Sequence, residues 1–75
     1  MSNMDIHTLQ IVLKHFGYFT GKVDGIWNRN TELALRKFQK EAGLLSLGAL
    51  DDKTLDKLNK LKIQLELDEA LAYTE

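Results

Sequence analysis

Apolar residues recur at helical spacing in three stretches of this 75-residue chain. The first stripe is made of Ile6, Leu9, Val12, Leu13 and Phe16. Asp5 stands before it as a typical N-cap, and Gly17 follows it as a typical C′ glycine. Met4 and Leu9 occupy the two positions of a hydrophobic staple around that cap. The pattern therefore predicts a helix between Asp5 and Gly17.

Two further helices follow from the same signals. The second starts at Asn28 or Asn30, which are both good N-caps, and ends before Gly43. Its apolar face is formed by Leu35, Phe38 and Ala42. The third starts at Asp51 and carries the stripe Leu55, Leu58, Leu61 and Leu65. No strand is needed to account for residues 1–61, so the chain is predicted to be all-α.

The tail, residues 62–75, has a mixed pattern. Ile63, Leu65 and Leu67 alternate with polar residues at a strand period, whereas Leu67, Ala70 and Leu71 fit a helix. We expect an extension of the third helix or a short extra helix. Four acidic residues lie in the last ten positions: Glu66, Asp68, Glu69 and Glu75. If the tail is helical, its apolar side is rotated from the main stripe, so the chain is either a monomer or a weak homodimer through the tail.

The two connections between the helices form a weak internal repeat. Each has a C′ glycine, an apolar pair, a second glycine, and then an apolar residue and an aspartate. This alignment pairs Gly21 with Gly48 and Asp24 with Asp51. Gln10 and Gln39 occupy matching places in the preceding helices, and we expect both to satisfy backbone groups of the turns. Two related helix–turn units packed together predict a compact three-helix bundle with one core.

Composition excludes several classes of protein. The formal net charge is −1, with ten basic and eleven acidic residues, so the chain has no nucleic-acid footprint. It has no cysteine, and no apolar run approaches the roughly 18 residues of a membrane span. The first five residues have neither a basic nor an apolar region typical of a signal peptide. We therefore expect a cytoplasmic product as synthesised, with no membrane partner.

Catalysis has little support in the sequence. His7 and His15 are eight residues apart on the first helix, roughly 12 Å by helical rise, so they are too far apart to share a metal ion. No serine neighbours a plausible base, and no glycine-rich phosphate loop or carboxylate pair is evident. We expect no catalytic residue, no metal site, no cofactor and no enzyme activity.

The spacing of motifs resembles the type 1 peptidoglycan-binding domain family. The resemblance covers Ile6 to Leu61 and rests on both halves of the chain. The matching residues are Leu9, Gln10, Leu13, Gly17 to Phe19, Gly21 to Gly25, Trp27, Thr31, Ala34, Phe38, Gln39, Gly43, Leu44, Gly48, Asp51, Thr54 and Leu58. The chain departs from the family at Asn28, where glycine is usual, and at Leu47, where threonine is usual. The resemblance implies a three-helix domain over residues 1–61, with residues 62–75 as a C-terminal tail outside the family pattern.

The resemblance also implies that the first turn binds peptidoglycan. Trp27, Asn28, Arg29 and Asn30 place a ring, two amides and a guanidinium at the start of a helix, whose positive end suits a carboxylate. Three of these residues have a structural alternative: Trp27 can pack on the core, and the two asparagines can serve as caps. Asp24 either bonds turn amides or contacts ligand. Tyr18 either packs in the core or reaches the rim with its hydroxyl.

Two functions follow from these observations. The first is a non-catalytic wall-binding module that contacts peptidoglycan through its stem peptide or its glycan. It would be a phage or bacterial targeting subunit that holds a lytic enzyme on the wall, as in an endolysin, and it would act at the cell wall if released. The second is a protein–protein interaction or regulatory protein that reuses the scaffold without binding the wall.

Overall fold

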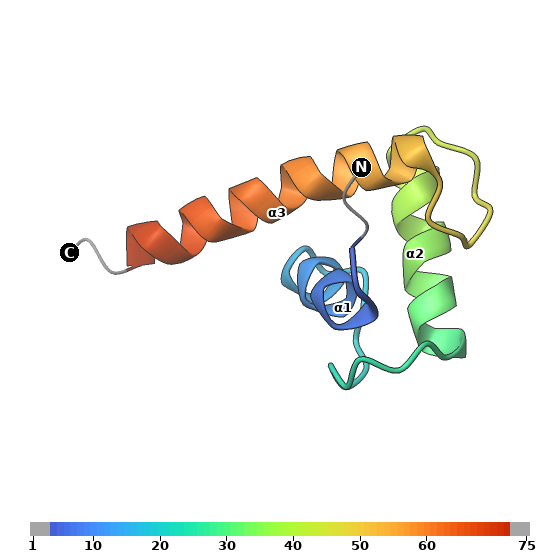
Figure 1. The fold of residues 1–75 in the computed structure, drawn as a ribbon, viewed down its shortest axis with the longest axis horizontal. Helices are drawn as coiled ribbons and strands as arrows, with labels where there is room; N and C mark the ends of the chain where they lie inside the picture. The colour runs from blue at the N-terminus through green and yellow to red at the C-terminus, as the bar shows by residue number, and fades with distance from the viewer. Residues whose placement is uncertain (1–3, 73–75) are drawn as a thin grey trace.

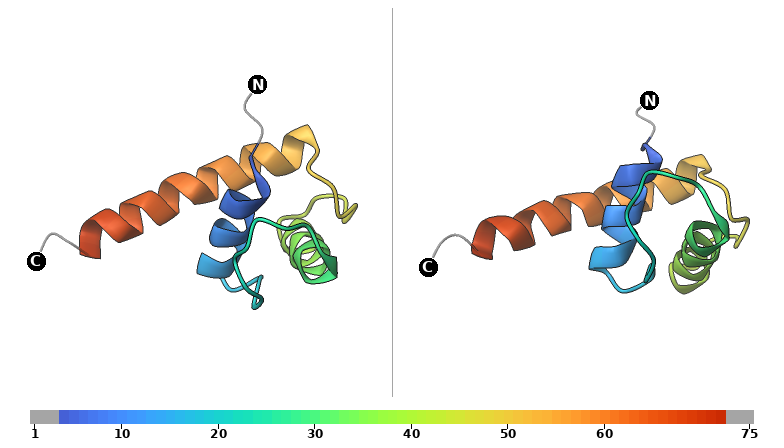
Figure 2. Two further views of the ribbon diagram at one scale, coloured as in Figure 1. Left: turned by 60° about the horizontal axis from the view of Figure 1, so that its bottom comes forward. Right: turned by 90° about the horizontal axis from the view of Figure 1, so that it is seen from below.

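The computed structural model describes residues 4–72, and this part of the chain forms three helices and no strand. Helix α1 spans Ile6–His15, α2 spans Arg29–Glu41 and α3 spans Asp52–Ala72. Helices α1 and α2 lie on the same side of α3, and the C-terminal half of α3 extends beyond both of them (Figures 1 and 2). The predicted all-α, three-helix class is confirmed.

Each helix begins at a side-chain cap. Asp5 Oδ1 accepts a hydrogen bond from the Thr8 amide at 2.7 Å, and Asp51 Oδ1 accepts one from the Thr54 amide at 2.9 Å. For α2 the structure selects Asn28 rather than Asn30 as the cap, because Asn28 Oδ1 accepts the Thr31 amide at 2.9 Å. These bonds satisfy N–H groups that have no acceptor within their own helix.

Helices α1 and α2 end in the same way. Gly17 and Gly43 adopt φ values of +86° and +75°, which a residue with a side chain rarely reaches. The next amides then turn back onto the helices: Tyr18 N–H donates to the Leu13 carbonyl and Leu44 N–H to the Gln39 carbonyl, both at 2.8 Å. This is the Schellman arrangement that a C′ glycine allows. Both predicted helix ends are confirmed.

Helix α3 continues through the tail without a break as far as Ala72, as an extension of the helix and not as a separate short helix. The chain has no proline and no glycine after Gly48, so nothing in the sequence interrupts the helix. Leu65 is only 6% exposed and attaches the extension to the core. His15 Nε2 and Asp68 Oδ2 lie 3.1 Å apart and form a second link, between the end of α1 and the extension. Glu75 lies outside the described residues.

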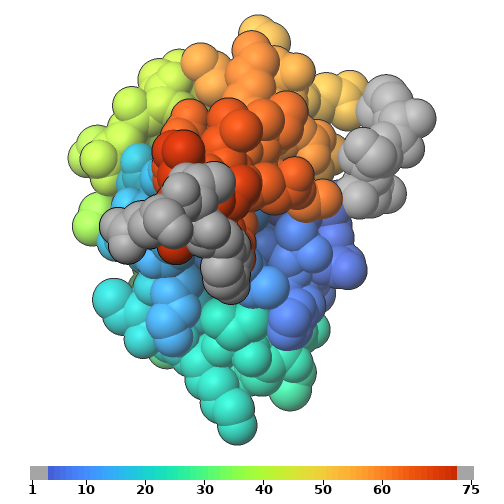
Figure 3. Space-filling view, turned by 90° about the vertical axis from the view of Figure 1, so that its left-hand side faces the viewer, coloured from blue at the N-terminus to red at the C-terminus, as the bar shows by residue number. Residues whose placement is uncertain are grey.

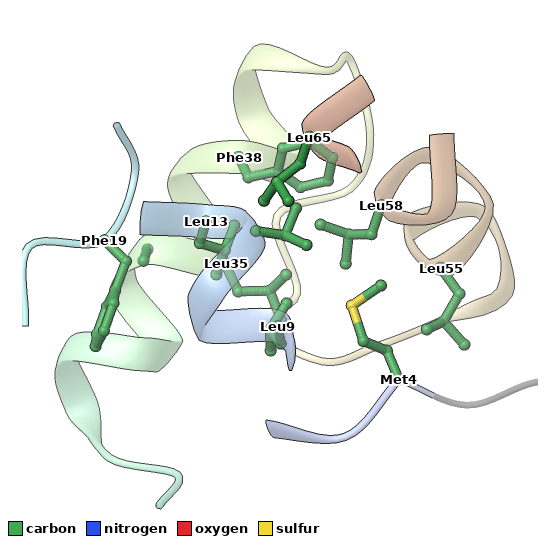
Figure 4. Packing of buried hydrophobic residues seen from close by; sticks show 11 residues of the cluster. Met4, Leu9, Leu13, Phe19, Leu35, Phe38, Leu55, Leu58 and Leu65 are labelled. Carbon is green, nitrogen blue, oxygen red and sulfur yellow. The ribbon is translucent and has the colours of Figure 1, made fainter. Parts of the chain in front are cut away.

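The core is one cluster of buried side chains, to which all three helices contribute (Figure 4). Leu9, Leu13, Leu35 and Leu58 are completely buried within it. Met4 is also buried, at 8% exposed, and joins this cluster ahead of α1. Seen from the C-terminal end of α3, this helix lies directly on α1 (Figure 3).

None of the helices in residues 4–72 is long and apolar enough to span a membrane.

Candidate functional site

The connection between α1 and α2, residues 16–28, is called the first turn, and the connection between α2 and α3, residues 42–51, the second turn. The buried side chain of Gln10 makes most of the hydrogen bonds that shape the first turn. Its Nε2 donates to Thr31 Oγ1 at 3.0 Å, to the Ile26 carbonyl at 3.0 Å and to Asp24 Oδ1 at 3.3 Å. Its Oε1 accepts from the amides of Asp24 and Gly25 at 3.1 and 2.9 Å. A single α1 side chain therefore fixes the path of the turn and the start of α2.

Gln39 does the same for the second turn. Its Nε2 donates to the Ala49 carbonyl at 2.9 Å and to Thr54 Oγ1 at 3.0 Å, and its Oε1 accepts from the Gly48 amide at 2.9 Å. Both glutamines are fully buried, and no buried side-chain polar atom in the described residues lacks a partner. The expectation that Gln10 and Gln39 satisfy turn backbone groups is confirmed.

These bonds correct the register of the internal repeat. Gly25 and Gly48 both donate to a glutamine Oε1 and have φ values of +76° and +71°, so Gly48 corresponds to Gly25 rather than to Gly21. Asp51 caps its helix as Asn28 does, so it does not correspond to Asp24. The residue at the place of Asp24 is Leu47. The sequence alignment was wrong because the first turn is longer, and only the hydrogen bonds show which glycines match.

Asp24 braces the first turn from within. Its Oδ1 accepts the Ile26 amide at 2.9 Å in addition to the bond from Gln10. The bond from the Ile26 amide is the main reason that the pKa of Asp24 lies below its ordinary value. Asp24 is therefore ionised at neutral pH and serves as a structural acceptor, as one of the two predicted roles requires.

Four predicted site residues lie together beside Asp24, at the start of α2. The indole of Trp27 is 38% exposed, and the side chains of Asn28, Arg29 and Asn30 are exposed. Asn28 Oδ1 also accepts the Thr31 hydroxyl at 3.1 Å, so this oxygen is committed to the fold. Arg29 and Asn30 make no side-chain hydrogen bond or ion pair within residues 4–72. We call Asp24, Trp27, Asn28, Arg29 and Asn30 the first-turn rim.

Tyr18 is not part of the first-turn rim. Its ring packs edge-on against Phe38, with the ring centroids 5.5 Å apart. Phe38 lies nine residues along α2 from Arg29, about 13 Å by helical rise. The structure therefore places Tyr18 at the other end of α2, partly buried beside the core.

His7 was not predicted as a site residue, yet it lies beside the first turn. A side-chain carbon placed on Gly25 would lie 3.7 Å from His7 Cβ, so this exposed histidine borders the turn that carries the first-turn rim. No sequence signal indicates this, because the approach depends on how the turn folds back over α1.

The second turn carries a surface hollow that sequence reasoning also missed. A hollow of about 300 Å³ is lined by Leu44, Asp52, Lys53, Asp56 and Lys57. Leu45 and Leu47 of the same turn are 73% and 52% exposed. The three leucines Leu44, Leu45 and Leu47 were the available signal, but their spacing also suits a turn packed on the core.

Within residues 4–72 no group of three or more histidine, aspartate or glutamate side chains is placed to hold a metal ion. The carboxylates nearest the first turn are occupied with helix caps and turn amides. The geometry places ring, amide and guanidinium groups together on one exposed part of the surface.

Comparison with known proteins decides the family. A family model described as "Putative peptidoglycan binding domain" matches residues 2–58, which is most of the chain. The chain belongs to this peptidoglycan-binding family. The prediction of the type 1 peptidoglycan-binding domain is therefore confirmed, and the three helices and their two turns are the fold of one such domain.

Several relatives with this domain are much longer proteins. The spore cortex-lytic enzyme of Bacillus cereus is 44% identical over 59 residues, which is 79% of this chain and 23% of the enzyme. The N-acetylmuramoyl-L-alanine amidase CwlM of Mycobacterium tuberculosis is 41% identical over 54 residues, 72% of this chain and 13% of the amidase. The localization factor PodJL of Caulobacter vibrioides is 31% identical over 58 residues, 77% of this chain and 6% of that protein. No solved structure gives a significant match.

The chain spans less than a quarter of the length of these relatives. The similarity to the two lytic enzymes is therefore confined to a peptidoglycan-binding domain and does not reach the rest of those proteins. The matched region is a binding module, and the family match ends at residue 58, before the extension of α3.

Proposed function

We propose that this chain is a non-catalytic module that binds peptidoglycan and holds a lytic enzyme of a bacterium or a phage on the cell wall. The observation that carries the proposal is the family match over residues 2–58, together with relatives that are named as wall-lytic enzymes. The role places the protein at the cell wall and assigns the chemistry of wall cleavage to another polypeptide or domain.

The first-turn rim is the surface that we propose for the wall. The indole of Trp27 offers a flat face for a sugar ring, while Arg29 offers a fork of donors that fits a carboxylate. The N-terminal end of α2 adds N–H groups that lack acceptors in their own helix, and this end of the helix attracts negative charge. Stem peptides carry carboxylates and glycan strands carry ring faces, so this surface suits both parts of peptidoglycan.

Sedimentation with purified, protein-free cell walls tests the proposal. We expect the chain to pellet with the walls at low salt, and we expect Trp27→Ala and Arg29→Ala each to weaken binding by about tenfold. Binding should be modest for one copy, because a shallow surface makes few contacts with its ligand. If the parent chain remains in the supernatant at low salt and Trp27→Ala behaves identically, the proposal is wrong.

Two matched controls separate the surface from general effects. Leu45 is 73% exposed on the second turn, at the other end of α2, so Leu45→Ala removes an exposed apolar side chain away from the rim. Lys37 is an exposed cation on α2, so Lys37→Ala removes the same charge as Arg29→Ala. Both controls should bind as the parent chain does. Titration with a soluble stem peptide and with a peptide-free glycan fragment, followed by amide chemical shifts, then shows which part of peptidoglycan moves the Arg29 and Asn30 signals.

A second candidate is a protein-interaction module on the same scaffold. The relative named as a localization factor favours it, because this domain occurs there in a protein that is not named as a wall enzyme. This reading predicts no pelleting with walls. It also predicts that Leu45→Gln and Leu47→Gln on the exposed second turn disturb function more than changes at the first-turn rim.

A further inference from the structure

The last two turns of α3, residues 66–72, lie well past residue 58, where the family match ends. Leu61 and Leu65, just before them, still pack on the core cluster. Within residues 66–72 only Asp68 is less than fully exposed, because its side chain approaches the end of α1. Burial therefore identifies Asp68 as the place where these two turns meet the rest of the domain.

Asp68 takes part in two side-chain interactions. Its Oδ1 accepts a hydrogen bond from Gln64 Nε2 at 2.8 Å, which stays within α3. Its Oδ2 lies 3.1 Å from Nε2 of His15, which is the last residue of α1 and is 53 positions away in the sequence. The contact between His15 and Asp68 thus fastens the last two turns of α3 to another helix.

The imidazole of His15 is well placed to respond to pH. It packs edge-on against the Phe16 ring, with the centroids 4.8 Å apart, and its side chain is 36% exposed, so solvent protons reach it. It also stands at the C-terminal end of a helix, which favours positive charge. Histidine changes charge between about pH 5 and pH 8. The contact therefore changes from an ion pair to a neutral hydrogen bond within that range.

We propose that His15 and Asp68 form a pH-sensitive clasp, which fastens the end of α3 to α1 in mild acid and loosens it above neutral pH. A protonated imidazole donates a charge-assisted hydrogen bond to the carboxylate, which is stronger than the bond from a neutral imidazole. When the clasp loosens, residues 66–72 fray more readily, as weakly attached helix ends do. The clasp does not depend on wall binding.

The carboxylate sets the acid limit of the clasp. The hydrogen bond from His15 is the main reason that the pKa of Asp68 lies below its ordinary value, and the bond from Gln64 adds to it. The contribution of Asp68 is complete above about pH 4 and is lost as the pH falls through this lowered pKa. The contribution of the imidazole charge is lost as the pH rises. The clasp is therefore tightest between about pH 4 and pH 6.

The charged groups of α1 and α2 leave this pair to itself. Lys14 is directed to the first turn, where its Nζ donates to the Gly21 carbonyl at 3.2 Å. His15 lies about 140° around α1 from Gln10, whose side chain reaches the start of α2. Helix α2 passes on the other side of α1 from the end of α3, so its charged residues do not face His15 (Figure 1).

The other charged residues of α3 are also directed elsewhere. Three lie on the far side of the core-facing line of the helix from Asp68: Lys62, Glu66 and Glu69. Two more lie about 12 Å or more back along the helix: Lys57 and Lys60. Of the charged groups in residues 4–72, His15 is the one whose charge lowers the pKa of Asp68. The pH response is therefore assigned to this pair.

Heteronuclear ¹⁵N–¹H NOE measurements on the full chain at pH 5.5 and pH 8.0 test the clasp. We expect the values for residues 66–72 to fall by about a third at pH 8.0, while those for residues 52–62 stay unchanged. Equal values at the two pH values overturn the proposal.

Two variants separate the charge of His15 from its packing. His15→Arg keeps a positive charge at both pH values, so the NOE values of residues 66–72 should stay high at pH 8.0. Asp68→Asn removes the carboxylate, so they should be low at both. The matched controls His7→Gln and Glu69→Gln remove the other histidine and a neighbouring carboxylate, and each should respond to pH as the parent chain does. A pH response that persists in His15→Arg, or that disappears in His7→Gln, overturns the proposal.

A double-mutant cycle measures the contact itself. His15→Ala, Asp68→Ala and the double variant are unfolded in urea at both pH values. We expect the pair to couple in the unfolding equilibrium constant by about threefold at pH 5.5 and by about 1.5-fold at pH 8.0. The same coupling at both pH values would show that the imidazole charge does not tighten the contact, and the clasp would not be a pH switch.

Discussion

The two turns of this domain share one internal design and differ on the surface. In each turn a buried glutamine from the preceding helix accepts a glycine amide, and it donates to a carbonyl and to a buried threonine hydroxyl of the next helix. The difference is at the place held by Asp24 in the first turn and by Leu47 in the second. Asp24 accepts two hydrogen bonds there, whereas Leu47 leaves a half-exposed apolar side chain.

In the second turn, which lacks an aspartate at this place, hydrogen bonds from a side chain of α2 hold the backbone. Arg36 Nη1 donates to the Ser46 carbonyl at 2.8 Å, and Ser46 Oγ donates to the Arg36 carbonyl at 3.0 Å. The same guanidinium pairs with Glu32, at 2.9 Å from Nε. The first turn is thus braced by its own aspartate, and the second by a side chain of α2. Because the buried glutamine sets the backbone, the outer residues of each turn are available for different surfaces.

The largest expected effect comes from removing the glutamines. Gln10→Leu should lower the free energy of unfolding by about 2–4 kcal/mol, since it removes the hydrogen-bond partner of the Asp24 and Gly25 amides and of the Ile26 carbonyl. Gln39→Leu should cost less, about 1–3 kcal/mol, because Gln39 makes three hydrogen bonds where Gln10 makes five. Urea denaturation followed by circular dichroism measures both. A larger loss for Gln39→Leu would contradict the account of the first turn.

For the matching glycines, Gly25 and Gly48, we expect the larger loss of stability in the second turn, whereas for the glutamines we expect it in the first. Gly25→Ala forces a side chain into a positive φ and should cost about 1–2 kcal/mol. Gly48→Ala adds a collision, because its Cβ would lie 2.8 Å from Arg36 Nε and 3.1 Å from Glu32 Cγ, so we expect about 2–3 kcal/mol. The same denaturation experiment compares them. Equal losses would show that Arg36 moves aside freely and does not hold the second turn.

The caps of α2 and α3 should respond differently to acid. Hydrogen bonds from the Thr54 hydroxyl and amide hold the pKa of Asp51 below its ordinary value, so its stabilising effect is complete above about pH 4 and is lost as the pH falls through the lowered pKa. Asn28 does not titrate. Asp51→Asn should therefore reduce the fall in Tm between pH 5 and pH 2.5, and Asn28→Asp should increase it.

Thermal unfolding at a series of pH values checks this prediction. Asp5, Asp24 and Asp68 also have lowered pKa values, through bonds from Thr8, Ile26 and His15 respectively, so some acid dependence remains in every variant. If Tm falls by the same amount on acidification in the parent chain and in Asp51→Asn, the charge of the cap does not stabilise α3.

The smallest expected effect tests whether an aspartate can stabilise the second turn as Asp24 stabilises the first. Leu47→Asp places a carboxylate where Asp24 stands in the first turn, two residues before the Ala49 amide. One added hydrogen bond should raise stability by about 0.5–1 kcal/mol, or Tm by about 2–8 °C. Leu45→Asp is the control, because it adds the same charge and removes a similar apolar side chain outside the brace position. A fall in Tm for Leu47→Asp alone would show that the two turns differ in backbone path.

Much of this domain could be predicted from local patterns. The N-caps Asp5 and Asp51, the C′ glycines Gly17 and Gly43, and the helical stripes all act within a few residues of where they stand, so the sequence displays them directly. The role of the two glutamines was predictable because each stands at the same point of a repeated pattern. The continuation of α3 was left open only because Ile63, Leu65 and Leu67 also fit the period of a strand.

Contacts between distant residues could not be predicted in the same way. The alignment of Gly48 with Gly25 depends on bonds that Gln10 makes to residues 14 to 21 positions away. The separation of Tyr18 from the first-turn rim, and the approach of His7 to that turn, follow from the packing of α1 on α2. The hollow beside Leu44 exists only where the second turn meets α3.

The sequence by itself determined where the helices begin and end and which faces are apolar, because capping, glycine geometry and periodicity are properties of short segments. Only the tertiary structure decided which turn residues correspond, which exposed side chains gather into one surface, and which apolar face of α3 is left outside. Those outcomes depend on how three helices share one core, and no segment carries that information alone.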